Sequence, residues 1–316
     1  MTEPSHSPDR APGRALDRAL PRRSDAEQPR EFRREITGVT LVAFEWSGEG
    51  APIVLVHGTG FHARVWDQVA RRLPGRRVIA VDLRGHGRSS KPEPPYTWSR
   101  LGEDVAGLIE GLDLHEVIGV GHSMGGHTMA DAATHCPERI ASLVLIDPTI
   151  LDSPTRADRP DRPNQFDFVL RRRNEWASPE EMIDRYAGRF PFSTWRAEVL
   201  RDYAVHGLLP SDAGEGYVLA CPPPVEAAVY AGRVRPGSEL VSELQKLTIP
   251  VRVLRARTAA PGEQPPPFAV SGTMPDLAAK MTDGTDFHLT HLGHFIPMEE
   301  PEVVARHIIE AADAVG

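Results

Sequence analysis

The segment that most constrains the fold is Glu116–Gly126, which reads EVIGVGHSMGG. Apolar and β-branched residues at its start predict a buried strand, and the residues Thr128–Ala133 predict a helix after it. Between them, Gly121–Gly125 matches the pattern G-x-S-x-G, in which glycines allow a sharp turn around a serine. The alternative is a glycine-rich connection with an incidental serine. The strand before and the helix after favour Ser123 as a candidate nucleophile, beside a helix N-terminus that stabilises negative charge.

Buried strands and helices alternate along the rest of the chain. Fully apolar or β-branched runs predict strands, and the residues between several of them have helical periodicity. This alternation predicts an α/β fold with a doubly wound, mostly parallel sheet. The clearest predicted strands are Val39–Phe44, Ile53–Val56, Arg77–Asp82, Leu143–Asp147, Val251–Arg255 and Phe287–Leu289, and the chain ends in a predicted helix at Glu302–Ala314.

The alternation stops over residues 151–247, which contain several helical patterns but no convincing buried strand. We interpret this stretch as a helical cap inserted over the edge of the sheet, with residues 31–150 and 248–316 forming the core. Residues 1–30 are polar, charged and poor in large apolar groups, so we expect a disordered tail.

Composition excludes several classes of partner. The net charge of −8 over 316 residues gives no general attraction to nucleic acid or to anionic membranes. No run is long enough to span a membrane, and the first thirty residues lack the apolar segment of a secretory signal. Cys136 and Cys221 each lie close to a proline and are expected to be buried thiols rather than a disulfide. We expect a cytoplasmic monomer or homodimer that acts on a small molecule.

A serine hydroxyl needs a base to remove its proton. His294, in the sequence Gly293–Phe295 after the last predicted strand, would lie at the same edge of the sheet as Ser123. Its neighbour His291 is the main alternative, and a histidine that merely lies in a surface loop is the other reading.

The imidazole needs a carboxylate to hold its tautomer. After the strand Val251–Arg255, the next five residues contain no acid, and the first acid is Glu263 in a Pro/Gly-rich loop. Asp147, in contrast, ends the strand that follows the nucleophile strand. We favour Asp147 over Glu263 as the third catalytic residue, although an acid before Pro148 is also typical of a cap or turn.

Acyl transfer also requires donors for a tetrahedral oxyanion. The backbone N–H of Met124 is one candidate, and that of Thr59, in the loop after Ile53–Val56, is the second. His57 in the same loop is interpreted as structural. His62 and Trp66 are weaker candidates for substrate binding, since Trp66 also fits a core position. We expect no metal, because His122 and His127 diverge on the helix and no second ligand cluster appears.

These motifs together resemble the α/β-hydrolase fold superfamily, over about residues 35–150 and 248–314. The resemblance rests on four segments in order: His57–Gly60 with Trp66, Asp82–Ser89, Gly121–Gly125, and Gly293–Phe295 followed by Glu300-Pro301. It implies a nucleophile at Ser123, a base at His294 and oxyanion donors at Thr59 and Met124. Some branches, including haloalkane dehalogenases, have the acid where Asp147 lies. Dehalogenases and epoxide hydrolases have an aspartate at position 123, so those activities are disfavoured.

The sequence therefore predicts a cofactor-free serine hydrolase that cleaves a carboxylic ester through an acyl-enzyme, with residues 151–247 forming an apolar pocket. Thioesterase, lactonase and C–C bond hydrolase activities would use the same residues. A small-molecule receptor with little turnover is an alternative of another class, if Asp147 does not reach His294. The substrate itself is not given by the sequence.

Overall fold

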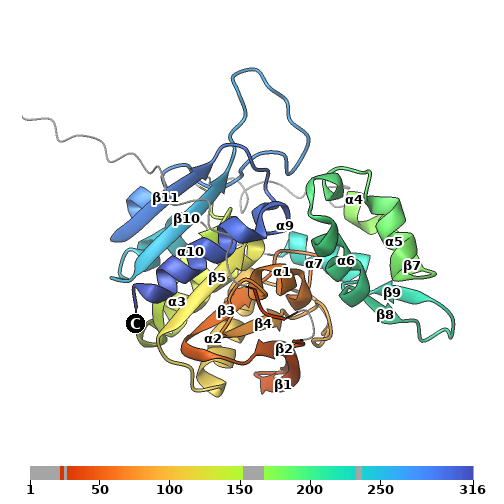
Figure 1. Cartoon of the computed structure of the whole chain (residues 1–316), viewed down its shortest axis with the longest axis horizontal. Helices are drawn as coiled ribbons and strands as arrows, with labels where there is room; N and C mark the ends of the chain where they lie inside the picture. Colours follow the sequence, from red (N-terminus) through yellow and green to blue (C-terminus); the bar gives the residue numbers. More distant parts are fainter. Residues whose placement is uncertain (1–21, 25–26, 152–166, 233–236, 316) are drawn as a thin grey trace, which may run out of the picture.

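The computed structural model describes residues 22–24, 27–151, 167–232 and 237–315. An eight-stranded sheet forms its centre, in the order β1-β2-β4-β3-β5-β6-β10-β11 (Figure 1). β1 and β2 pair in antiparallel fashion, as do β2 and β4, and all other neighbours are parallel. The strands are β1 (Arg30–Ile36), β2 (Val39–Trp46), β3 (Glu49–Val56), β4 (Arg76–Asp82), β5 (Val117–His122), β6 (Ile140–Ile146), β10 (Pro250–Ala256) and β11 (Asp283–Leu289). The predicted α/β fold class is confirmed.

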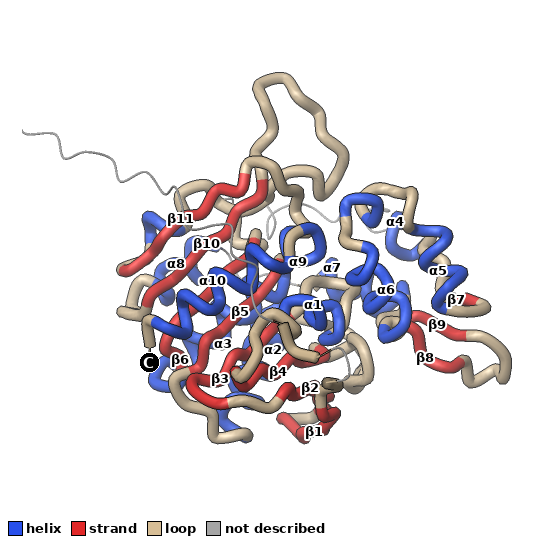
Figure 2. Tube along the Cα trace, viewed as in Figure 1, coloured by secondary structure: helices blue, strands red, loops and turns tan. Residues whose placement is uncertain are grey.

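Helices cover both faces of this sheet (Figure 2). One face packs against α2 (Trp98–Gly111), α3 (Met124–His135) and α8 (Gly237–Leu244), and the other against η1 (Ala63–Trp66), α1 (Asp67–Ala70) and α10 (Pro301–Asp313). Successive residues of a strand point to opposite faces. Accordingly, Ile53 and Leu55 of β3 join one apolar cluster while Val54 and Val56 join the other. A strand buried on both faces must be apolar throughout, which explains the uniform runs in the sequence.

Short helices complete the core: η2 (Pro137–Arg139), η5 (Ala278–Lys280) and α9 (Ile296–Glu299). None of the helices in the described ranges is both long and apolar enough to cross a membrane. Cys136 and Cys221 are buried free thiols, as the sequence predicts. Burial raises the pKa of Cys136 to about 12, so this thiol stays protonated.

The segment between β6 and β10 differs from the prediction in two respects. Besides helices, it contains a three-stranded antiparallel sheet in the order β7-β9-β8. These strands have only two or three residues each, which is too short for an alternating pattern to be visible in the sequence. The elements of this segment are α4 (Asp167–Leu170), β7 (Glu175–Trp176), α5 (Pro179–Tyr186), η4 (Phe192–Thr194), α6 (Ala197–His206), β8 (Leu208–Pro210), β9 (Tyr217–Leu219) and α7 (Pro223–Ala231).

The second difference concerns α8, which the prediction placed in the cap. Leu240, Val241 and Leu244 of α8 are buried in the apolar cluster that also contains Met129 of α3. α8 is therefore part of the layer that covers the sheet. We name the residues 167–232 the insertion from here on.

The N-terminal prediction also needs correction at its end. Residues 1–21 and 25–26 of the expected disordered tail lie outside the described residues. Arg23, however, is 7% exposed, and its guanidinium donates hydrogen bonds to the backbone oxygens of Ala70 (3.2 Å) and Ser47 (3.0 Å). Arg30 already belongs to β1. An arginine can satisfy several carbonyls at once, so a polar segment packs here without a large apolar residue.

Candidate active site

Ser123 lies in a tight turn between β5 and α3, at the carboxyl edge of the sheet. Its φ of 57° lies in the left-handed region, which L-residues other than glycine seldom adopt. The flanking glycines make the turn possible. A Cβ on Gly121 would lie 2.2 Å from the oxygen of Gly125, and a Cβ on Gly125 would lie 2.3 Å from the oxygen of Val56. The G-x-S-x-G spacing is thus required by backbone packing on both sides of the serine.

His294 lies in the loop after β11, and its ring faces Ser123. The distance from His294 Nε2 to Ser123 Oγ is 2.9 Å. The backbone N–H of His294 donates to the oxygen of Phe268 (3.1 Å), and its carbonyl accepts from His122 Nε2 (2.8 Å). These bonds fix the loop, so the imidazole is held in position before any substrate arrives.

Asp147 follows β6 and contacts the other nitrogen of the same imidazole. Its Oδ2 lies 2.6 Å from His294 Nδ1. Its Oδ1 accepts hydrogen bonds from the N–H of Ala256 (3.0 Å) and from the hydroxyl groups of Thr273 (3.3 Å) and Ser271. Since Nδ1 donates to Asp147, Nε2 is left to accept the hydroxyl hydrogen of Ser123.

The surroundings of Asp147 favour its charged form. Burial alone would raise the pKa of this carboxyl, but the hydrogen bonds and charge of His294 and the bonds from Ser271 and Ala256 outweigh it, so the pKa of Asp147 is lowered. The sequence did not reveal Ser271 and Thr273 as partners, because they follow β10 by more than a dozen residues and carry no motif.

The alternative residues for the base and the acid lie elsewhere. His291 is exposed. Glu263 pairs with Arg257 at 2.8 Å and accepts from the N–H of Ala260 at 2.9 Å. The hydrogen bond from Arg257 lowers the pKa of Glu263 to about 2. Glu263 therefore has its own partner, and it is Asp147 that contacts His294.

The loop after β3 approaches the serine from the other side. A Cβ on Gly58 would lie 3.2 Å from the Cβ of Ser123, so only a glycine permits this approach without a shift. The hydroxyl of Thr59 donates to the sulfur of Met124 at 3.2 Å. This contact joins the two residues whose backbone N–H groups are the predicted oxyanion donors, and it occupies the Thr59 hydroxyl.

The histidines near this loop have structural partners. His57 Nδ1 contacts the oxygen of Gly58 at 2.8 Å, and its Nε2 accepts from the N–H of Leu83 at 3.1 Å. Burial and the neighbouring His86 hold the pKa of His57 well below its usual value. His122, which holds the carbonyl of His294, has its pKa lowered to about 3, first by burial. Both rings are therefore neutral.

The prediction that His62 and Trp66 line the substrate pocket is wrong for two pockets beside Ser123 that the described residues form. Neither residue contributes to their walls. His62 is 3% exposed and its Nε2 contacts the oxygen of Tyr203 at 3.1 Å, whereas Trp66 is fully buried in the core. The helical spacing of Trp66 matched a core position as well as a pocket position, and the core position is the correct one.

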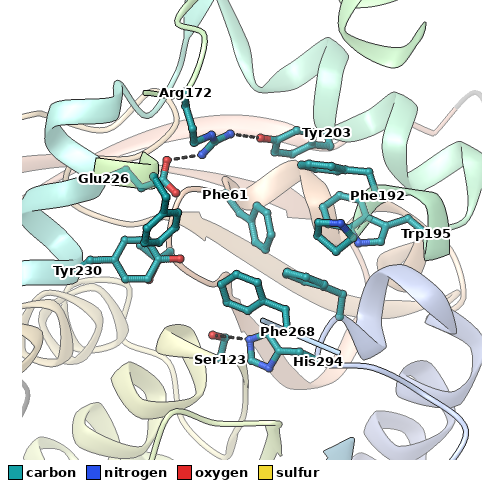
Figure 3. Close-up of a pocket in the computed structure, with 14 residues that line it drawn as sticks. Phe61, Ser123, Arg172, Phe192, Trp195, Tyr203, Glu226, Tyr230, Phe268 and His294 are labelled. Atoms are coloured by element: carbon teal, nitrogen blue, oxygen red, sulfur yellow. Dashed lines mark hydrogen bonds and ion pairs between the residues drawn. The ribbon is translucent and has the colours of Figure 1, made fainter. Parts of the chain in front are cut away.

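Two cavities meet at Ser123 and His294. The first, which we call the aromatic pocket, has a volume of about 140 Å³ and lies between the sheet edge and the insertion (Figure 3). The second has a volume of about 230 Å³ and extends past Pro148 and Trp98. Thr59, Tyr230 and Phe268 line both. The remaining residues of the aromatic pocket are Phe61, Phe168, Arg172, Pro191, Phe192, Trp195, Tyr203, Glu226 and Phe295.

Sequence reasoning did not find Arg172, Tyr203 or Glu226. Arg172 lies in the loop after α4, Tyr203 in α6 and Glu226 in α7, so no motif or spacing connects them. The one feature that they share in the sequence is a polar side chain within residues 151–247, which we expected to form an apolar pocket.

The structure also brings together three side chains of the types that bind metals. Among the described residues, the ligand atoms of Asp67, Asp202 and His206 lie within 4.8 Å of one another. Asp67, however, already forms a bidentate ion pair with Arg64, whose Nε and Nη2 lie 2.7 and 2.6 Å from the two carboxylate oxygens. The guanidinium therefore already balances the charge of this carboxylate. This group does not include Ser123, His294 or Asp147.

The chain is similar to known proteins along most of its length. A model of the alpha/beta hydrolase family matches residues 53–307. A 2-(acetamidomethylene)succinate hydrolase from Mesorhizobium japonicum is 29% identical over 285 residues, which cover 89% of this chain and 95% of that protein.

Solved structures match along nearly the whole chain. The crystal structure of an E-2-(acetamidomethylene)succinate hydrolase superposes with a TM-score of 0.69 at 24% identity, covering 90% of this chain and 99% of the other. A thermophilic esterase from Thermogutta terrifontis superposes with a TM-score of 0.65 at 26% identity, covering 90% and 99%. Because the family model spans most of the sequence, the chain belongs to the alpha/beta hydrolase family.

Proposed function

We propose that this protein is a cofactor-free serine hydrolase that cleaves a carboxylic ester through an acyl-enzyme. The comparisons support a hydrolase in general. The observation that carries the finer proposal is the continuous chain of hydrogen bonds from Ser123 through His294 to Asp147, at 2.9 and 2.6 Å, at the junction of two cavities. A nucleophile, a base and an orienting acid in this order are the elements that acyl transfer requires.

In the proposed reaction, Ser123 Oγ forms a bond to the ester carbonyl carbon while its proton passes to His294 Nε2. The carbonyl π electrons move onto oxygen, where the backbone N–H groups of Thr59 and Met124 stabilise the negative charge. Collapse of this intermediate breaks the C–O bond to the alcohol, which receives the proton from His294.

The second half of the reaction repeats these steps with water. His294 takes a proton from water as the water oxygen bonds to the acyl carbon, and the C–Oγ bond then breaks as Ser123 regains the proton. Asp147 stabilises the imidazolium in both halves. Because its carboxylate is buried, bonded on both oxygens and low in pKa, it remains charged at neutral pH.

The alternatives differ in the bond that is broken. Thioesters, lactones and the C–C bonds of β-diketone-like compounds place an electrophilic carbonyl before the same three residues. The name of the Mesorhizobium relative indicates hydrolysis of a substituted succinate, and that of the Thermogutta protein indicates an esterase. The receptor hypothesis depended on an acid that fails to reach His294, and Asp147 lies 2.6 Å from it.

The free, buried thiols of Cys136 and Cys221 support a reducing compartment such as the cytoplasm, which we propose as the site of action.

Turnover of a panel of esters and matched thioesters of increasing chain length tests the proposal. We expect ester hydrolysis with a burst of alcohol release, and loss of at least about 10³-fold in kcat for Ser123→Ala. Hydrolysis of thioesters alone would replace the ester proposal, and turnover that Ser123→Ala leaves unchanged would overturn the mechanism.

A further inference from the structure

The aromatic pocket ends in a buried ion pair that the proposed mechanism does not use. Arg172, which follows α4, contacts the Glu226 carboxylate of α7 through one terminal nitrogen and donates to the hydroxyl of Tyr203 (2.9 Å) through the other. The Arg172 and Glu226 side chains are 20% and 6% exposed. Figure 3 shows this pair at the end of the pocket away from Ser123 and His294.

Aromatic rings line the pocket from Ser123 and His294 to this ion pair. Phe61 packs edge-on against Trp195 and Tyr203, with ring centroids 5.6 and 5.8 Å apart, and Phe268 stacks on His294 at 5.6 Å. A substrate arm that extends from Ser123 toward Arg172 therefore passes mainly aromatic surface and meets the ion pair at its tip.

The charge at the tip is already balanced. The guanidinium and the carboxylate neutralise each other, so the end of the pocket has no net charge to offer. A substrate carboxylate placed there would bring a second negative charge beside Glu226 in a buried site, where like charges repel strongly. Glu226 thus opposes the recognition of acids that Arg172 alone would favour.

An uncharged group with both a donor and an acceptor fits this pair better. The guanidinium carries five N–H groups, and the contacts to Glu226 and Tyr203 engage its two terminal nitrogens. A hydroxyl or a primary amide is able to accept from the guanidinium and donate to the carboxylate at the same time. An alkyl end makes neither hydrogen bond, so it would displace water from Arg172 and Glu226 without replacing the hydrogen bonds that the water makes.

We propose that the arm of the substrate in the aromatic pocket has an apolar body and ends in an uncharged hydrogen-bonding group, a hydroxyl or a primary amide, and that carboxylate-ended arms are rejected. This inference rests on the proposed esterase function and names its substrate class. It separates this protein from a hydrolase of dicarboxylates such as the one that the name of its Mesorhizobium relative denotes.

The test uses two series of esters with a fixed chain length and four ends: methyl, hydroxyl, primary amide and carboxylate. In one series the variable end belongs to the acid and nitrophenol is the leaving group; in the other it belongs to the alcohol of an acetate ester. In at least one series we expect kcat/KM for the hydroxyl and amide ends to exceed that for the carboxylate end by about 100-fold.

Glu226→Gln removes the negative charge and keeps the size of the side chain. We expect it to raise the relative kcat/KM of the carboxylate-ended ester by about tenfold or more, because Arg172 then has a free positive charge. Glu180→Gln is the matched control, since Glu180 is an exposed acid of the same insertion, and it should leave the ratio unchanged. Arg172→Met combined with Glu226→Leu should shift the preference to the methyl end.

Two results would overturn the inference: carboxylate ends that react as fast as hydroxyl ends in both series, or a ratio that Glu226→Gln does not change. If no ester is hydrolysed, the esterase proposal fails separately. Calorimetric titration of Ser123→Ala with the N-methyl amides of the same four acids, and with the corresponding N-acetyl amines, then measures the preference without turnover. The hydroxyl and amide ends should still bind more tightly than the carboxylate end, and the reverse order would exclude the inference.

Discussion

Asp147 and Ser123 both have backbone conformations with positive φ, 38° and 57°, immediately after neighbouring parallel strands. Such conformations cost about 1–3 kcal/mol each and persist where surrounding contacts hold them. The N–H of Ser123 donates to the oxygen of Ile146 (3.0 Å), and that of Asp147 to the oxygen of Leu254 (2.7 Å). These bonds tie the two turns to β6 and β10, so the sheet sets the positions of Ser123 and Asp147.

Replacing Asp147 by asparagine should change the tautomer of His294. Asp147→Asn should lower kcat by about 10⁴-fold, because an amide hydrogen toward His294 Nδ1 forces the imidazole into the tautomer that is unable to accept from Ser123. Steady-state hydrolysis of the best ester measures this.

Glu263→Gln serves as the control, since Glu263 is exposed and paired with Arg257. We expect a change of less than about twofold. The opposite ranking of the two variants would return the acid role to Glu263.

Asp147 could be predicted because the residues directly after β10 contain no acid and because carboxyl ends of parallel strands meet at one edge of a sheet. Arg172 and Glu226 could not be predicted. Their pairing depends on how α4 and α7 fold over the sheet, and a charged residue in a helical pattern is indistinguishable from one on a solvated face.

Among the connections between elements, the turn between β5 and α3 tightly restricts which residues the sequence can have. A methyl group on Gly121 would meet the backbone of Gly125, which has no flexible end to move away. We expect Gly121→Ala to lower the free energy of unfolding by more than about 3 kcal/mol or to prevent folding.

Gly188→Ala is a suitable control for this variant. Gly188 has open space around its Cα and a negative φ, so an added methyl group should change the free energy of unfolding by less than about 0.5 kcal/mol. Urea denaturation of both variants measures the difference. Equal stability of the two would mean that the turn relaxes more easily than its packing indicates.

The short strands of the insertion could not be predicted from the sequence pattern. Long, apolar strands such as β3 and β6 produce a clear signal because both faces are buried. β7, β8 and β9 have two or three residues and, within the part of the chain that the structure describes, pair only with one another. Their formation depends on tertiary contacts, which local sequence does not encode.

At the scale of the whole molecule, several buried histidines are neutral in the folded protein. Burial, followed by the charge of His206, lowers the pKa of His62 from 6.5 to about 3. In the unfolded chain, His62 has a pKa near 6.5, so below about pH 6.5 it binds a proton that it does not bind in the folded protein. Between about pH 6.5 and 3 its burial therefore costs stability as the pH falls.

This linkage predicts a difference between the wild type and His62→Gln, which has no proton to bind. As the pH falls from 6 to 5, the free energy of unfolding of the wild type should decline relative to the variant by about 1.2 kcal/mol. Urea titrations of both proteins at several pH values measure the slope. Parallel pH profiles would show that His62 is protonated in the folded state.

The most direct test of the catalytic account is covalent labelling with a fluorophosphonate, followed by mass spectrometry of the peptides. A fluorophosphonate reacts with a serine only when a base activates the hydroxyl and the site accepts a tetrahedral phosphorus centre. We expect one adduct, on Ser123, that is absent in Ser123→Ala and forms far more slowly in His294→Gln. An adduct on another residue, or equal labelling of Ser123 in the wild type and in His294→Gln, would contradict the proposed mechanism.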